Sequence, residues 1–129
     1  MPHGLIVMVW NERYGVEIVA KYPLDTTSRI TEKTLIQIYN MHQFSRESGI
    51  AALTIEGVNF QSYYTGEPTG LYIILVLNIL ENPEDYELRL SEVTLKILNN
   101  LADEKYIELL PSLFKQISAK PPLNFTSDK

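Results

Sequence analysis

The sequence predicts a single α+β domain in which helices cover both faces of a five-stranded, mainly antiparallel sheet. Its 129 residues are enough for one hydrophobic core without disulfides or metal ions, and 45% of them are apolar. Glycines separate short apolar runs of the kind that form strands. Other stretches repeat their apolar residues every three or four positions, as amphipathic helices do. We expect one domain over residues 1–120 and a flexible C-terminal tail over residues 121–129.

The first two strands are expected to form an antiparallel hairpin. Residues 5–10 are an unbroken apolar run, and residues 16–22 alternate apolar with polar side chains. The segment that joins them ends at Gly15 and has a length suited to a hairpin turn. The alternation predicts one apolar face on the second strand, made of Val16, Ile18, Ala20 and Tyr22.

An amphipathic helix is expected to begin at Thr31, whose side chain suits an N-cap, and to end by Gly49. Ile30, just before the cap, is placed to pack on Leu35 as a hydrophobic staple. Because successive helical residues are rotated by about 100°, the core face is predicted to contain Leu35, Ile38, Met41 and His42.

Three more strands are expected over residues 50–55, 59–65 and 71–80, with glycine-containing turns between them. The strands at 5–10 and 71–80 are the two continuous apolar runs, which is typical of strands covered on both faces. We therefore place these two strands together at the centre of the sheet. This gives the order 2-1-5-4-3, with the first helix on one face and the last two helices on the other.

Two C-terminal helices complete the predicted element order β-β-α-β-β-β-α-α. Asn82 followed by Pro83 is an N-cap with proline at the first helical position. The third helix is expected to begin near Asp103, and Pro111 to kink it or to start it afresh. The core face of the second helix is predicted to contain Tyr86, Leu90, Val93, Ile97 and Leu101.

Composition argues against several classes of protein. The net charge of −5, without a basic stripe, disfavours nucleic acid as a partner. The absence of cysteine excludes disulfides and thiolate metal sites and fits a reducing compartment. The apolar stretch at 71–80 is too short for the roughly 20 residues that span a bilayer. We expect a cytoplasmic protein without a targeting or transmembrane segment, which partners can recruit to membranes.

No sequence motif for nucleotide binding or nucleophilic catalysis occurs, and we expect no catalytic residue, cofactor or metal ion. His3 and His42 lack further ligands at metal-binding spacing and are expected to be structural. The acidic side chains of residues 84–87 lie at a helix start, which indicates complementation of the helix dipole and not acid–base catalysis. Residues 66–70 can form an anion-binding loop, but their glycines and proline are more typical of a simple turn.

The N-terminal segment resembles the first hairpin of longin-type proteins. The resemblance is carried by Gly4-Leu-Ile-Val-Met-Val-Trp10, by the short turn through Gly15, and by Val16-Glu-Ile-Val-Ala-Lys-Tyr-Pro23. The predicted order of elements also resembles the longin fold over nearly the whole chain. That fold is related to the profilin and roadblock domains.

The resemblance implies a non-enzymatic platform for other proteins. Longin-like domains dimerise, bind small GTPases or their regulators, or fold back on a SNARE helix in membrane traffic. We find no SNARE heptad segment in the sequence, so the closer analogy is a free-standing longin, as in adaptor small subunits and tethering complexes. The expected partner is a small GTPase, a GTPase regulator, another longin or roadblock domain, or a second copy of the chain.

Apolar residues outside the core faces predict where a partner binds. Ile36 and Phe44 lie on the polar side of the first helix without an expected cover. The strand at 50–55 is an edge in the predicted order and carries no charge to discourage pairing with another strand. Leu88 and Leu95 also miss the core face of the second helix, and we expect the third helix to cover them. The predicted partner surface is one continuous patch of Ile36, Phe44, Ile50, Leu53 and Ile55.

Two other functions stay open. A small-molecule sensory module of PAS-like shape needs a pocket beneath the sheet, lined by residues such as Trp10, Tyr63 or Tyr72. A closed core would argue against that function. A profilin-like actin binder is a further alternative within the class of interaction modules.

Overall fold

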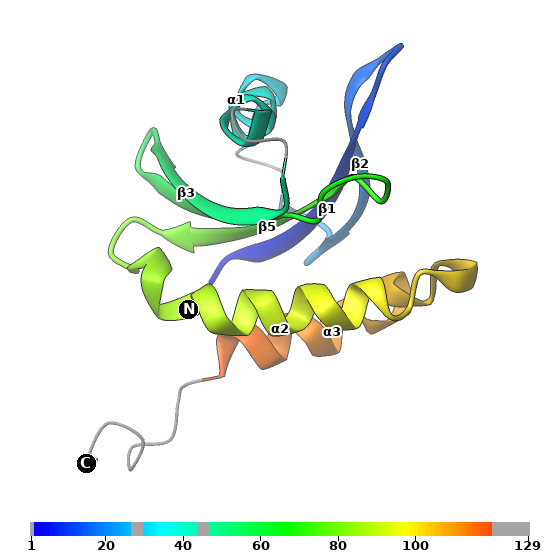
Figure 1. Ribbon diagram of the computed structural model, residues 1–129. Coiled ribbons are helices and arrows are strands. Elements are labelled where there is room, and N and C mark those ends of the chain that lie inside the picture. Colours follow the sequence, from blue (N-terminus) through cyan, green and yellow to red (C-terminus); the bar gives the residue numbers. More distant parts are fainter. Residues whose placement is uncertain (1, 27–29, 44–46, 120–129) are drawn as a thin grey trace.

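The computed structural model describes residues 2–26, 30–43 and 47–119. It contains a five-stranded sheet between two helical layers, with α1 on one face and α2 and α3 side by side on the other (Figure 1). The strands are β1 (Gly4–Asn11), β2 (Gly15–Tyr22), β3 (Gly49–Ile55), β4 (Val58–Tyr64) and β5 (Leu71–Asn78). The α-helices are α1 (Glu32–Gln43), α2 (Glu87–Leu98) and α3 (Lys105–Ser118), and short 3-10 helices occur at η2 (Pro83–Tyr86) and η3 (Ala102–Glu104).

The sheet has the order β2-β1-β5-β4-β3, and all four neighbouring pairs are antiparallel. The predicted fold class, strand order and placement of the helices are therefore confirmed. β1 and β5 lie at the centre, and every residue of β5 from Leu71 to Leu77 is buried. The continuous apolar runs identified these strands because both of their faces are covered.

The two faces of the sheet support two separate hydrophobic layers. We call the layer under α1 the α1 layer and the layer under α2 and α3 the α2–α3 layer. Neighbouring residues of a strand point to opposite faces, so Ile74 packs in the α1 layer and Leu75 in the α2–α3 layer. The sheet curves around α1, which lies on its concave side (Figure 1).

A β-bulge in β2 changes the predicted face of that strand. β1 and β2 are in register on both sides of Val19, which has no partner residue on β1. One extra residue reverses the side to which the following side chains point. Val16 and Ile18 consequently pack in the α1 layer, whereas Ala20 and Tyr22 pack in the α2–α3 layer. The prediction of a single apolar face on this strand is wrong.

Helix α1 begins as its sequence predicts. The Thr31 hydroxyl accepts a hydrogen bond from the Thr34 amide at 3.2 Å, which makes Thr31 the N-cap. Ile30 packs against the cluster that contains Leu35, as expected of a hydrophobic staple. The predicted core face is also confirmed: Leu35, Ile38 and His42 are buried, and Met41 is partly buried against them.

The C-terminal helices match the prediction at Asn82 and depart from it at Leu101, and at Pro111 one of the two predicted outcomes, a fresh helix start, does not occur. The Asn82 side chain accepts a hydrogen bond from the Glu84 amide at 3.1 Å, so the predicted N-cap is confirmed, at the start of η2. Leu101 is exposed and not in the core, because α2 already ends at Leu98. Pro111 does not start a new helix, since α3 continues through it. Of the described helices, none is long and apolar enough to cross a membrane.

Continuation through Pro111 has a physical reason. Proline at this position leaves the carbonyl oxygen of Ile107 without the usual amide donor. The apolar face of α3 nevertheless stays buried against the sheet and α2 on both sides of the proline, and this burial outweighs the local cost. The buried residues of that face are Tyr106, Leu110, Leu113 and Ile117.

Candidate functional site

The predicted partner surface is distributed over both faces of the sheet. Leu53 and Ile55 are partly buried and pack in the α1 layer, while Ile50 packs in the α2–α3 layer on the opposite face. Ile36 is partly buried on α1, and Phe44 lies outside the described residues. Ile50 therefore cannot join Leu53 and Ile55 in one patch, because the period of a strand is two.

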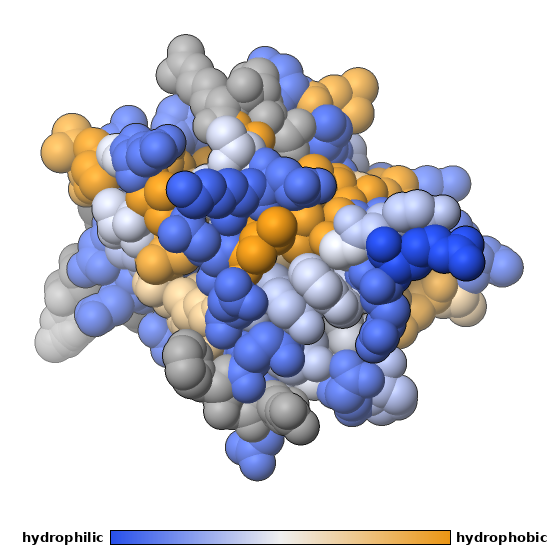
Figure 2. Space-filling view, turned by 90° about the horizontal axis from the view of Figure 1, so that it is seen from above, coloured by the Kyte–Doolittle hydropathy of each residue, from blue (hydrophilic) through white to orange (hydrophobic). Residues whose placement is uncertain are grey.

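The β3 strand is nevertheless an accessible edge. It pairs with β4 on one side only, and its seven residues include no charged side chain. Ala52 and Thr54 along this edge are exposed. On the face that carries α1, seen from above in Figure 2, hydrophobic side chains are interrupted by hydrophilic ones. The edge of the sheet is thus a clearer candidate for binding than a broad apolar patch.

The exposed leucines of α2 correct one expectation. Leu88 and Leu95 are 73% and 61% exposed, so the predicted cover by α3 is wrong. Helix α3 packs on a different side of α2, where the Arg89 guanidinium donates hydrogen bonds to the carbonyl oxygens of Ile117, at 2.7 Å, and Ala119. The two leucines are left on the outer side of the helix.

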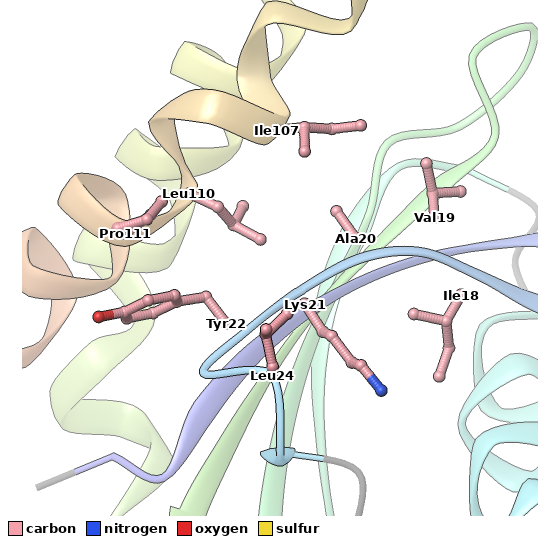
Figure 3. Close-up of a pocket in the computed structure, with 9 residues that line it drawn as sticks. All are labelled: Ile18, Val19, Ala20, Lys21, Tyr22, Leu24, Ile107, Leu110 and Pro111. Carbon is pink, nitrogen blue, oxygen red and sulfur yellow. The ribbon is translucent and has the colours of Figure 1, made fainter.

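A groove between β2 and α3 was not predicted from the sequence. It encloses about 440 Å³ and is lined by residues 18–22 and Leu24 on one side and by Ile107, Leu110 and Pro111 of α3 on the other (Figure 3). Leu24 and Ile107 are exposed at this groove. The bulge at Val19 turns Ala20 and Tyr22 of its lining to the face that carries α3, and the sequence has no recognisable signal for this bulge.

A second cavity, which we call the aromatic pocket, lies at one end of the sheet on the α1 side. It forms where the β1–β2 turn, the β4–β5 loop and the C-terminal end of α1 meet. The β1–β2 turn and the β4–β5 loop lie at the same end of the sheet because β1 and β5 pair antiparallel, with Val9 near the end of β1 opposite Leu71 at the start of β5. Its volume is about 370 Å³, and its lining includes Trp10, Glu12, Tyr39, Tyr64, Glu67 and Tyr72.

The aromatic rings of the pocket contact one another in a row. Trp10 of β1 stacks on Tyr39 of α1, with ring centroids 4.0 Å apart and planes inclined by 13°. Tyr39 approaches Tyr72 at 5.7 Å, and Tyr72 stacks on Tyr64 at 4.6 Å. Such pairs each contribute roughly 0.5–1.5 kcal/mol beyond the burial of their area. The row of rings is a wall built from four elements, β1, α1, β4 and β5.

Hydrogen bonds fix the polar groups of the pocket. The Tyr64 hydroxyl donates to Glu67 Oε2 at 2.9 Å, and the Gln43 amide donates to the Tyr72 hydroxyl at 3.2 Å. Burial raises the pKa of Tyr64, and the Glu67 carboxylate raises it further. Burial likewise raises the pKa of Tyr72. Both hydroxyls therefore stay protonated at neutral pH, and Tyr64 acts as the donor that orients Glu67.

The aromatic pocket bears on the sensory alternative. Trp10 and Tyr72 line it as that alternative requires, whereas Tyr63 points to the other face and packs in the α2–α3 layer. The α1 side of the sheet is therefore not fully closed. Tyr63 lies outside the pocket because successive side chains of a strand point to opposite faces, so Tyr63 and its neighbour Tyr64 on β4 face opposite sides of the sheet.

His42 is buried beside the pocket and not part of its lining. Its ring centroid lies 5.8 Å from that of Tyr64 and 5.6 Å from that of Tyr72. Burial lowers the pKa of His42, and a hydrogen bond with the backbone of Ser62 only partly opposes this. Nε2 has no hydrogen-bond partner among the described residues. The neutral ring therefore packs as part of the core.

The structure gives little support to a metal site or to an anion-binding loop. Within the described ranges, no three acidic or histidine side chains are grouped so that they could hold a metal ion. Residues 66–70 form a closed turn, in which the Gly70 amide donates to the Gly66 carbonyl oxygen at 2.8 Å. Gly66 has a φ of 80°, and a Cβ atom there would come within 3.2 Å of the Ser48 amide nitrogen. The Glu67 carboxylate in this turn disfavours the binding of an anion.

Comparison of the chain with models of known protein families and with curated proteins found no match. The function must therefore be inferred from the surfaces of this chain. The surfaces that geometry distinguishes are the uncharged β3 edge, the groove beside β2 and the aromatic pocket.

Proposed function

We propose that the chain is a non-enzymatic protein-interaction module of the longin type. Its partner is a small GTPase, a GTPase regulator, another longin or roadblock domain, or a second copy of the chain. The protein works in the cytoplasm and reaches membranes through such partners, as in vesicle-trafficking complexes. The order of the elements and of the strands is consistent with this proposal. The fold alone is a weak argument for function, so the proposal depends on a specific surface.

The β3 edge is the observation that carries the proposal. Unpaired backbone amides and carbonyls at a sheet edge can hydrogen-bond to a strand of another protein. Soluble proteins commonly protect such edges with charged residues or proline, and β3 has neither. Leu53 and Ile55, partly buried on the α1 side of this strand, offer apolar contact next to the edge.

Light scattering of the purified chain tests the proposal. Mass is measured for the chain alone over a range of concentrations, and with candidate GTPases loaded with GDP or with GTP. We expect either a dimer or a complex with one of these GTPases. Ala52→Lys should weaken that association by about tenfold or more, because it places a charge on the exposed edge.

The matched control is Ala102→Lys, which makes the same substitution at an exposed position outside the sheet. It should leave association within about twofold of the wild type. If the chain neither self-associates nor binds any tested GTPase, the proposed function is wrong. If both variants bind like the wild type, the protein interacts through a surface other than the β3 edge.

The sensory function is the second candidate, and the aromatic pocket favours it. A volume of about 370 Å³ lies at the small end of the roughly 300–1,000 Å³ of typical ligand pockets. A small aromatic or amine ligand would fit, and a large cofactor would not. A thermal-shift screen with small molecules that carry no guanidinium group tests the sensory function, because any molecule that binds the folded chain raises its melting temperature. No shift with any of these molecules would argue against a sensory module.

A further inference from the structure

The aromatic pocket is lined by carboxylates and by aromatic rings, and both kinds of group attract cations. Glu12 comes from the β1–β2 turn and Glu67 from the β4–β5 loop, and both are exposed. No described residue that lines the pocket is basic. The C-terminal end of α1, at Gln43, adds the negative end of a helix dipole. The charged side chains that line the pocket are therefore all negative, on a chain whose net charge is −5.

A hydrogen bond from Tyr64 orients the carboxylate of Glu67 before any cation binds. Tyr64 is buried with 4% of its surface exposed, and its hydroxyl donates to Glu67 Oε2. This bond limits the rotation of the carboxylate, and among the described residues no hydrogen bond to Oε1 is seen. A carboxylate that is already fixed loses less side-chain entropy when it binds a donor than a freely rotating carboxylate does.

The rings of the pocket select among cations. The Trp10 ring stacks on the Tyr39 ring, yet 38% of the Trp10 surface stays exposed. A guanidinium group is planar, stacks on aromatic surfaces and donates two parallel hydrogen bonds to a carboxylate, whereas an ammonium group is a compact and strongly hydrated charge. The pocket is also large enough for one extended side chain.

We propose that the aromatic pocket binds the guanidinium group of an arginine from a partner protein, with Glu67 as its carboxylate partner and Trp10 as its stacking surface. This proposal rests on the proposed function, because a protein partner supplies the arginine. It adds a specific recognition residue that the β3 edge lacks. Strand pairing is largely independent of sequence, whereas an arginine-binding pocket discriminates among partners.

The single tryptophan of the chain makes the pocket directly measurable, since Trp10 is the only source of tryptophan fluorescence. The full chain is titrated with Nα-acetyl-arginine methylamide, and with Nα-acetyl-lysine methylamide for comparison. We expect a saturable change in Trp10 fluorescence with the arginine derivative and at least about threefold weaker binding of the lysine derivative. Equal binding of both derivatives would overturn the assignment to guanidinium.

Two isosteric variants locate the site. Glu67→Gln should weaken binding of the arginine derivative by about tenfold, because the charged partner is lost. Glu56→Gln, at an exposed glutamate in the β3–β4 turn, is the matched control and should bind like the wild type. Circular dichroism verifies that both variants are folded. No saturable signal, or the same affinity in both variants, overturns the pocket.

A competition experiment tests the source of the guanidinium. If light scattering identifies a complex, a saturating concentration of the arginine derivative should weaken that complex by at least about threefold, and Glu67→Gln should weaken it as well. If the derivative binds the chain but the complex is unaffected, or if no complex exists, the arginine of a partner is excluded as the ligand. Failure of the fluorescence titration therefore refutes the pocket, and failure of light scattering refutes the proposed function.

Discussion

At the scale of single residues, burial decides what the polar groups on the α1 side do. His42 was predicted from its spacing to lie at the core face of a helix, and the structure places it 5% exposed among tyrosines. Its environment penalises the charged form, so its pKa is lowered from the ordinary value of 6.5. Because the unfolded chain binds this proton more readily than the folded chain, acid destabilises the fold.

A pH series measures this effect. The stability that His42 contributes as a neutral group is complete above pH 6.5 and is lost as the pH falls below 6.5 toward its folded-state pKa. Urea unfolding should show the free energy of unfolding falling in this window by up to about 1.4 kcal/mol per pH unit. His42→Gln should reduce this slope. Equal slopes in the wild type and His42→Gln would contradict the pKa direction.

The aromatic pocket illustrates what residue patterns can and cannot predict. The sensory alternative requires a pocket lined by residues such as Trp10, Tyr63 or Tyr72, and the structure brings Trp10 and Tyr72 together in one pocket but places Tyr63 on the other face of the sheet. Glu12 and Glu67 were missed, because turns bring them beside these rings and no sequence period reports where a turn points. Phe44, named for the partner surface, lies outside the described residues.

At the scale of elements, periodicity predicted the strands and helices, and errors arose where one residue broke the period. The order of the sheet followed from the two continuous apolar runs in β1 and β5. The residues of β2 that follow the bulge at Val19 point to the opposite face from the one predicted, since one extra residue exchanges the two faces. Leu101 was misplaced because its spacing continues the apolar repeat beyond the end of α2 at Leu98.

Pro111 provides a prediction for α3. The proline costs the helix one backbone hydrogen bond, and alanine is the better helix former by about 3 kcal/mol in a helix interior. Part of this gain is offset because proline also restricts the unfolded chain. Pro111→Ala should raise the free energy of unfolding by about 1–2 kcal/mol in urea unfolding. Ser112→Ala, at the next and exposed position, should change it by less than about 0.5 kcal/mol. If Pro111→Ala lowers the free energy of unfolding, the packing of the proline ring contributes more stability than the lost helical hydrogen bond costs.

At the scale of the whole molecule, one sheet joins two hydrophobic layers into a single cooperative unit. Ile74 and Leu75 are neighbours on β5, and both are fully buried in opposite layers. Loss of packing in either layer removes support from the same central strands. The two layers should therefore unfold together, as small domains usually do.

Truncation of one residue in each layer tests this cooperativity. Ile74→Ala and Leu75→Ala should each lower the free energy of unfolding by about 2–5 kcal/mol. Trp10 fluorescence reports the α1 layer, because Trp10 stacks on Tyr39, which packs in that layer. Circular dichroism at helical wavelengths reports mainly α2 and α3, which together are longer than α1. The two signals should give the same urea midpoint in each variant. Separate midpoints would show that the layers unfold independently.

The central claim is that the chain binds another protein through the β3 edge, and hydrogen exchange tests it most directly. Amide exchange is measured on the chain alone at low concentration, and then at high concentration or with the GTPase that forms a complex. We predict that exchange slows in β3, residues 49–55, and stays unchanged in the opposite edge strand β2, residues 15–22. Unchanged exchange in β3, or protection confined to β2 and the groove beside α3, would contradict the claim.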